Sequence, residues 1–199
     1  MHTFGVTSTV IQKEAGLDKK TVASLLSEWR GLLHQDDAHP MGVPTGLVEA
    51  DETAVGKRKF NRGKRQRQAG TQWVQTALEV QQRDDGSRTP KRLRAQFVSD
   101  RSAETLQGNL AIWVSDEARV QTDGWKGYAS IPAVRHDTVN HSKQFVCYKK
   151  SRKISINALE GAHGVIKTKA RTLNMFVGHP TQQKESLHKK LDELVFRFI

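Results

Sequence analysis

Three acidic residues in three separate sequence contexts have the type and order needed for metal-dependent phosphoryl chemistry. Asp51 lies in VEADET, Asp123 in VQTDGWKGYA and Glu160 in INALEGAHGVIKTK. Cleavage of a phosphodiester builds up negative charge, which two divalent cations about 4 Å apart can neutralise while they activate the attacking oxygen. Hard cations prefer carboxylate and water oxygens. We therefore expect the three acids to hold two Mg²⁺ or Mn²⁺ ions, the alternative being that they are solvated surface charges like most acids.

The elements around these acids predict an α/β fold with a mixed sheet and flanking helices. Asp51 ends a strand-like run, and a meander follows with strands at 72–81 and in RLRAQFV, joined by the turn DDGSRTP. Residues 102–114 predict a helix with Ser102 as its cap, and ARVQT predicts the next strand, which ends just before Asp123. Three strands, a helix and a further strand form the order of a ribonuclease-H-like domain.

Residues 1–45 predict a small helical segment and a linker ahead of a domain at 46–199. Two short amphipathic helices flank Gly16, and Asp18 can cap the second. The apolar stripe of that second helix consists of Val22, Leu25, Leu26, Trp29 and Leu33. This is a helix-turn-helix outline, in which Lys19 and Lys20 would meet DNA phosphates. A plain packing or dimerisation role is the alternative.

The charge balance favours a polyanionic partner. The 199 residues contain 32 Lys and Arg against 21 Asp and Glu, which gives a net charge of +11. Nucleic acid is the leading candidate, and a basic protein that merely stays soluble is the alternative. Cys147 is the only cysteine, so neither a disulfide nor a cysteine zinc cluster can form within one chain. No membrane span or signal core is predicted, so we expect a soluble intracellular protein, nuclear in a eukaryote and cytoplasmic in a bacterium.

A run of basic residues directly after the Asp51 strand is the strongest candidate for DNA contact. It consists of Lys57, Arg58, Lys59, Arg62, Lys64, Arg65 and Arg67. Such a run can track a phosphate backbone and release counterions, although a solvated loop or an import signal has the same composition. Lys167 follows Glu160 by seven residues, so a helix returns it to the same face, where it could touch a substrate phosphate or simply be exposed.

Four further residues near the acids have two interpretations each. Asn157, one turn before Glu160, could orient a metal-bound water or cap the helix, and capping is favoured. Glu52 would point away from Asp51 on a strand and is expected either to support the metal ligands from behind or to be structural. Trp125 and Tyr128 follow Asp123 and are expected in the core more than as platforms for base stacking.

Six sequence blocks, in order, resemble the Merlin-type DDE transposases and the bacterial insertion-sequence transposases with an ISXO-like DDE domain. The blocks are VEADETAVGKRKFNRG, QWVQTALEV, DRSAETL, TDGWKGY, VNHSK and NALE, and the likeness covers most of residues 47–198. It implies a DDE transposase that cleaves and transfers strands of double-stranded DNA as a homo-oligomer. It also assigns metal binding to Asp51, Asp123 and Glu160, and places His141 in the active-site wall.

The chain departs from this family around its third acid. The family usually has His-Thr-Asn before that position and Trp three residues after Glu, whereas this chain has Ser155, Ile156 and His163 there. Gly161 and Gly164 further weaken the helix, by about 1 kcal/mol each relative to Ala. The alternative function is therefore a catalytically decayed or domesticated transposase that keeps its DNA-binding surface.

Overall fold

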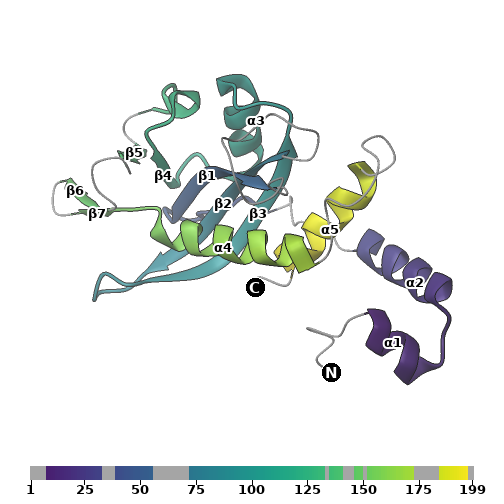
Figure 1. The fold of residues 1–199 in the computed structure, drawn as a ribbon. Coiled ribbons are helices and arrows are strands. Elements are labelled where there is room, and N and C mark those ends of the chain that lie inside the picture. The colour runs from purple at the N-terminus through teal and green to yellow at the C-terminus, as the bar shows by residue number, and fades with distance from the viewer. Residues whose placement is uncertain are drawn as a thin grey trace, which may run out of the picture.

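A mixed five-stranded sheet forms the centre of the protein (Figure 1). The structure, a computed structural model, describes residues 8–32, 39–55, 72–132, 135–140, 146–149, 152–172 and 184–196. The strands are β1 (Leu47–Val55), β2 (Gln72–Gln82), β3 (Arg88–Val98), β4 (Arg119–Asp123) and β5 (His136–Val139), in the spatial order β3-β2-β1-β4-β5. The first three are antiparallel, and β4 and β5 run parallel to β1. The predicted α/β fold with a mixed sheet is confirmed, and its strand order is consistent with a ribonuclease-H-like domain.

The prediction that Asp51 ends its strand is wrong. β1 continues to Val55 because it pairs with β2 along its whole length, from Leu47 opposite Val80 to Val55 opposite Gln72. The parallel pairing with β4 is shorter and stops at Ala50 opposite Thr122. Asp51 therefore lies in the middle of β1 and directly beyond its last pair with β4.

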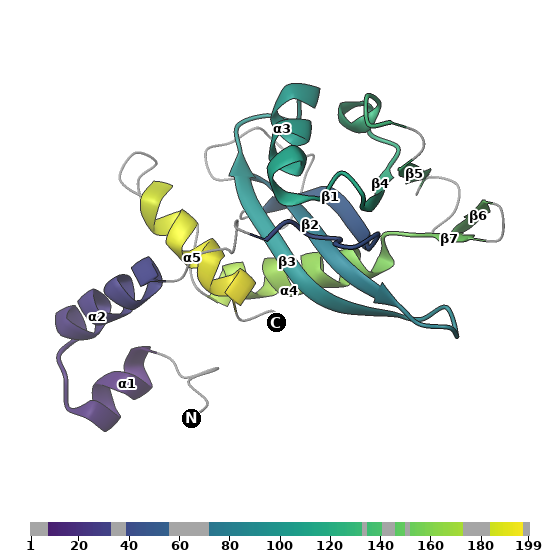
Figure 2. The same cartoon turned by 180° about the vertical axis from the view of Figure 1, so that it is seen from behind.

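Helices cover both faces of the sheet (Figure 2). On one face, α3 (Ala103–Trp113) packs Leu106 and Leu110 against Val48, Ala50 and Val120. Ser102 caps this helix as predicted, since its Oγ accepts the Thr105 N–H at 3.3 Å. On the other face lie α4 (Asn157–Thr172) and α5 (Lys184–Phe196), whose buried residues include Leu159, Ile166, Leu191 and Leu194, in one cluster with Val74 and Leu78 of β2.

Short elements connect the parallel strands to α4. The 3₁₀ turn η2 (Lys126–Tyr128) follows β4 and packs against α3. The hairpin of β6 (Cys147–Lys149) and β7 (Arg152–Ile154) precedes α4, and Ile154 and Ile156 pack with Val139 of β5. This small cluster fixes the path of the chain into the first turn of α4.

The N-terminal helices α1 (Ser8–Ala15) and α2 (Lys19–Leu32) lie at the periphery, where α2 contacts α5. Asp18 caps α2 as predicted, accepting the N–H groups of Lys20 and Thr21 at 2.7 and 3.1 Å. Arg30 of α2 pairs with Glu193 of α5 at 2.5 Å. In the predicted stripe Val22 is buried, whereas Leu25 is 49% exposed. The two helices and their turn are present, and their role as a DNA-binding helix-turn-helix stays a prediction.

The last residues of the segment before β1 already pack into the α/β domain. Met41 is fully buried and exchanges main-chain hydrogen bonds with Trp113 and Ser115 at the end of α3. The domain boundary predicted at residue 45 thus falls a few residues after the first contact with the domain. None of the helices in the described part of the chain combines the length and apolarity of a membrane span.

Candidate active site

Asp51 and Asp123 are neighbours at the point where the parallel pairing of β1 and β4 ends. Each directly follows the last parallel pair, Ala50 and Thr122. Strand alternation places Val48 and Ala50 toward α3, so Asp51 lies on the opposite face, toward α4. Burial, together with the negative charge of Asp123, raises the pKa of Asp51 to about 7. Two carboxylates that repel each other in a half-buried position suit a divalent cation, which would remove the repulsion.

The third acid, Glu160, lies on the helix α4, which passes the face of the sheet that carries Asp51. Glu160 lies in the first turn of α4, where its N–H donates to Ile156 O at 3.0 Å, and its side chain is exposed. One turn later, His163 is buried, with Nδ1 4.0 Å from Asp51 Oδ2. Among the described residues, no three His, Cys, Asp or Glu side chains lie close enough to hold a metal ion as they stand. The structure therefore brings Asp51 and Asp123 together and places Glu160 one helical turn from the residue that approaches Asp51.

Glu49, two residues before Asp51 on the same face of β1, fixes the start of α4. Its Oε2 accepts the Leu159 N–H at 2.9 Å, and its Oε1 accepts from Arg88 Nη1 at 2.6 Å. Arg88 also donates to the carbonyl oxygens of Ser155 and Lys153, at 2.6 and 2.8 Å. Burial raises the pKa of Glu49, against the hydrogen bonds and the Arg88 charge that favour its ionised form. A carboxylate at a helix N-terminus satisfies N–H groups that the helix itself leaves open.

Sequence reasoning did not identify the role of Glu49. The available signal was its spacing from Asp51, because residues i and i+2 of a strand share a face. Any helix that brought Glu160 near Asp51 would therefore also pass close to Glu49. Its partner Arg88 lies far away in the sequence on β3, and that pairing could not be read from the local motif.

Glu52 faces away from Asp51, as predicted, and belongs to a polar cluster on the α3 side. Arg101 Nε donates to Glu52 Oε2 at 2.6 Å, and the Tyr128 hydroxyl donates to Glu52 Oε1. The Arg101 guanidinium also lies between two rings, 4.5 Å from the centroid of Trp73 and 4.2 Å from that of Trp125. This flat cation between two indoles links β1, β2 and the chain that follows Asp123.

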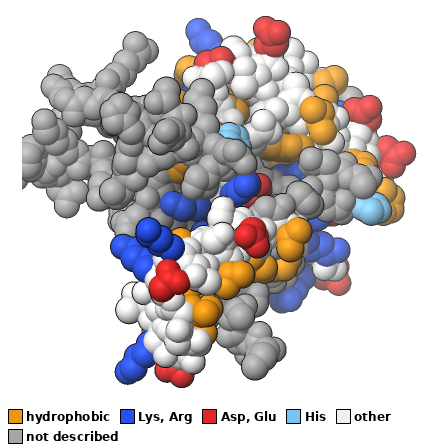
Figure 3. Space-filling model, turned by 90° about the vertical axis from the view of Figure 1, so that its right-hand side faces the viewer, with side chains coloured by type: hydrophobic (Ala, Val, Ile, Leu, Met, Phe, Trp, Pro, Cys, Tyr) orange, Lys and Arg blue, Asp and Glu red, His pale blue; other side chains and the backbone are white. Residues whose placement is uncertain are grey.

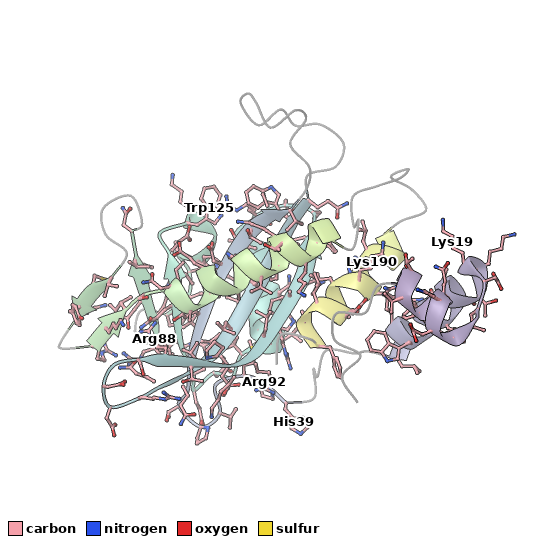
Figure 4. All side chains as sticks on the ribbon, turned by 60° about the horizontal axis from the view of Figure 1, so that its bottom comes forward. Lys19, His39, Arg88, Arg92, Trp125 and Lys190 are labelled. Carbon is pink, nitrogen blue, oxygen red and sulfur yellow. The ribbon has the colours of Figure 1, made fainter. Side chains whose placement is uncertain are left out.

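Trp125 and Tyr128 differ in their surroundings. Tyr128 is fully buried, which confirms its place in the core. Trp125 is 39% exposed beside Asp123, a position at the surface that the core interpretation did not predict (Figure 4). Its main-chain N–H donates to Asp123 Oδ1 at 2.9 Å, and its indole N–H donates to Arg101 O at 3.1 Å. Trp125 thus orients one oxygen of Asp123.

The structure describes only some of the residues predicted to contact DNA. All seven cations from Lys57 to Arg67, and also His141, lie outside the described residues. Lys167 is exposed on α4, and its charge contributes, after burial, to a pKa of about 4 for His163. Lys19 and Lys20 are exposed at the start of α2, and Lys19 lies well away from the sheet (Figure 4). The described basic side chains visible in Figure 3 form several separate groups with acidic and apolar side chains between them.

Asn157 is the first residue of α4 and is exposed. Its N–H donates to Ser155 Oγ at 3.1 Å, while Glu49 accepts the N–H of Leu159. At this helix start, Ser155 and Glu49 therefore satisfy N–H groups that a cap would satisfy. The proposed role of Asn157 in orienting water stays a prediction.

Comparison with known proteins bears on this site. A protein-family model described as an ISXO2-like transposase domain matches residues 45–198. No curated protein matches the chain. The matched span contains all five strands of the sheet, the helices α3, α4 and α5, and the three predicted metal-binding acids.

Proposed function

Because the chain belongs to the family of ISXO2-like transposase domains, we propose that it is a DDE transposase that cleaves and transfers DNA strands. The observation that carries this proposal is the adjacency of Asp51 and Asp123 on neighbouring strands, directly beyond the last parallel pair of β1 and β4, with the helix of Glu160 passing the same face. The ribonuclease-H-like fold and the closer relationship to Merlin-type enzymes are part of the same proposal.

Asp51, Asp123 and Glu160 are the proposed ligands of two Mg²⁺ or Mn²⁺ ions. When bound, these ions supply the positive charge that a phosphodiester needs in its transition state and activate the attacking oxygen. Asp51 and Asp123 contribute carboxylates from adjacent strands, and Glu160 contributes one from α4 with a side chain that is longer by one methylene group. Trp125 holds Asp123 through its main-chain N–H, and Arg101 keeps Trp125 in place.

Double-stranded DNA is the proposed substrate and partner. The net charge of +11 supports it, because lysine and arginine side chains release counterions when they neutralise phosphates. The basic run that begins at Lys57, together with Lys167, would contact the cleaved end, and Lys19 and Lys20 would contact flanking DNA. Action as a homo-oligomer on paired DNA ends belongs to this proposal as well.

A second candidate function is DNA binding without catalysis. It is favoured by the exposed side chain of Glu160 and by the absence, among the described side chains, of a three-ligand cluster. A transposase that had lost its activity would keep its basic residues and its fold, since both also serve binding. The two candidates differ in whether DNA is cut.

The test is Mn²⁺-dependent nicking of a labelled duplex that carries the ends of the element. We expect wild-type protein to cut it, and D51N, D123N and E160Q to bind it without cutting. Asparagine at position 123 retains an oxygen for the Trp125 N–H, so the fold should be preserved. The control is E79Q, which removes a carboxylate of β2 that pairs with Arg92 and lies opposite Val48 near the start of β1. The E79Q protein should cut normally.

Loss of cutting in all three variants and in EDTA supports the two-metal enzyme. Salt-sensitive binding of these ends by the wild type, without any cutting in Mn²⁺, supports the DNA-binding protein instead.

A further inference from the structure

His163 is a buried residue next to the candidate metal ligands, and the proposed mechanism does not use it. It lies one turn after Glu160 on α4 and is 6% exposed. Its two ring nitrogens have different neighbours: Nε2 lies 2.7 Å from Thr76 Oγ1, and Nδ1 lies 4.0 Å from Asp51 Oδ2. Thr76 is itself the residue of β2 that pairs with Asp51 across the sheet.

The hydrogen bonds around Thr76 decide which nitrogen of His163 carries the proton. The Thr76 hydroxyl donates its single hydrogen to the main-chain oxygen of Asp51 at 2.9 Å, since a carbonyl can only accept. The same hydroxyl must then accept from His163, so the proton lies on Nε2. In the neutral imidazole, Nδ1 is left with a lone pair, and this lone pair lies on the side of Asp51.

We propose that His163 Nδ1 is a further ligand of the cation that Asp51 holds. This inference rests on the proposed function, because it needs a cation at Asp51. Bonds from a cation to nitrogen or oxygen ligands are about 2.0–2.2 Å long, so two of them can span about 4 Å. One ion lying between Nδ1 and the Asp51 carboxylate can therefore touch both.

The arrangement of Thr76 and His163 is the one that histidine ligands require. A histidine ligand usually donates its other ring N–H to a fixed acceptor, which sets its tautomer and its orientation. Thr76 supplies that acceptor from β2, next to Asp51 in the sheet. An imidazole ligand also bears on the preferred metal, because imidazole suits transition metals, whereas Mg²⁺ is suited by carboxylate and water oxygens. His163 would thus weaken the preference of the site for Mg²⁺.

Pulsed electron paramagnetic resonance of Mn²⁺ bound to the full chain tests the proposal. A directly bound imidazole gives the Mn²⁺ signal a hyperfine coupling to ¹⁴N, and we expect this coupling in the wild type. The matched variant is His163→Gln, because its amide nitrogen can take the place of Nε2 beside Thr76 while Nδ1 is removed. We expect H163Q to bind Mn²⁺ without the ¹⁴N coupling and at least about tenfold more weakly, with a smaller loss for Mg²⁺.

Thr76→Val is the complementary variant, since it removes the acceptor and keeps both ring nitrogens. We expect it to retain the ¹⁴N coupling and to bind Mn²⁺ about tenfold more weakly. If H163Q does not fold, His163→Phe fills the volume of the ring without any nitrogen and should also lose the coupling.

Two results would overturn the assignment in distinguishable ways. Mn²⁺ that binds the wild type but not D51N, and shows no ¹⁴N coupling or the same coupling in H163Q, would exclude His163 as a ligand and leave the proposed function standing. A wild type that binds no Mn²⁺ at all would remove the metal site from both proposals.

Discussion

Two carboxylates of β1, two residues apart on the same face, have opposite surroundings. The Glu49 anchor, by which we mean Glu49 with Arg88, pairs a buried carboxylate with a guanidinium and with the N–H of Leu159. Asp51 instead faces another carboxylate and Nδ1 of the His163 imidazole. The first arrangement is complete in itself and positions α4, whereas the second is electrostatically unfavourable, and the proposed cation would relieve it. The same face of one strand thus carries a compensated carboxylate at Glu49 and an uncompensated one at Asp51.

The largest expected effect comes from breaking the Glu49 anchor. E49Q removes the charge that balances the buried Arg88 guanidinium, and loss of one partner of a buried ion pair costs about 3–5 kcal/mol. We expect the free energy of unfolding in urea to fall by that amount. E79Q is the matched control, because Glu79 and Arg92 are partly exposed and such pairs contribute about 0–1 kcal/mol.

If E49Q lowers the free energy of unfolding no more than E79Q does, Glu49 does not anchor α4. The double variant E49L/R88M sharpens the test, because it removes both charges together and should recover part of the stability lost in E49Q.

Replacement of the Asp51 carboxylate should raise the free energy of unfolding, in contrast to that of Glu49. Its pKa is raised from 3.8 to about 7, so between these values the folded protein binds a proton that the unfolded chain releases. Stability therefore falls as the pH rises through this range. D51N removes the charge and keeps an oxygen for the Glu52 N–H, so at pH 8 we expect it to be more stable than the wild type by on the order of 2–4 kcal/mol.

Thermal unfolding from pH 4 to pH 8 in EDTA measures this difference, which should shrink toward zero at the acid end. The depressed pKa of His163 reduces stability below about pH 6.5 in both proteins and so cancels in the comparison. Added Mn²⁺ should stabilise the wild type and leave D51N unchanged. A D51N protein less stable than the wild type in EDTA at pH 8 would show that the Asp51 charge is already compensated.

Arg101 extends the comparison to the other face of β1. In R101A the buried Glu52 keeps its hydrogen bond from Tyr128 but loses its cation. We expect the free energy of unfolding to fall by about 1.5–3 kcal/mol, because hydrogen bonds to charged groups contribute about that much. R101K retains a positive charge but not the flat surface between Trp73 and Trp125, so its loss should be smaller.

Urea unfolding followed by tryptophan fluorescence reports both stability and the surroundings of the two rings. Equal losses for R101A and R101K would mean that the planar stacking, and not the charge, holds this cluster together.

The same contrast explains how much the sequence could predict. Local patterns identified the strands around Asp51 and Asp123, the helix of Glu160 and the caps Asp18 and Ser102, because each depends on residues a few positions apart. The extension of β1 beyond Asp51 depends on pairing with β2, and the Glu49 anchor depends on Arg88 from β3. Neither could be derived from a local motif, because both partners come from elsewhere in the chain. The position of His163 opposite Thr76 also required the sheet register and the path of α4.

The smallest expected effect concerns Gly161 and Gly164 in α4. An added Cβ would meet no atom within 4 Å at either position, so neither glycine is needed for close packing with the described residues. G161A and G164A should each raise the free energy of unfolding by about 0.5–1 kcal/mol, because alanine favours the helix. Gly127 is the control with the opposite sign, since its Cβ would lie 2.8 Å from Leu106 Cδ1 and G127A should destabilise the protein.

The affinity of these stabilised variants for Mn²⁺ shows whether the first turn of α4 stays fixed or deforms when Glu160 reaches the aspartates. If G161A gains stability and binds Mn²⁺ as the wild type does, the Glu49 anchor alone suffices to position the first turn of α4. If stability rises while Mn²⁺ affinity falls, the turn from Glu160 to His163 must deform to bring its side chains to the aspartates. Glycine in that turn would then lower the cost of the deformation. Loss of stability in G161A would contradict both, because it would require a contact that the open space around this position does not provide.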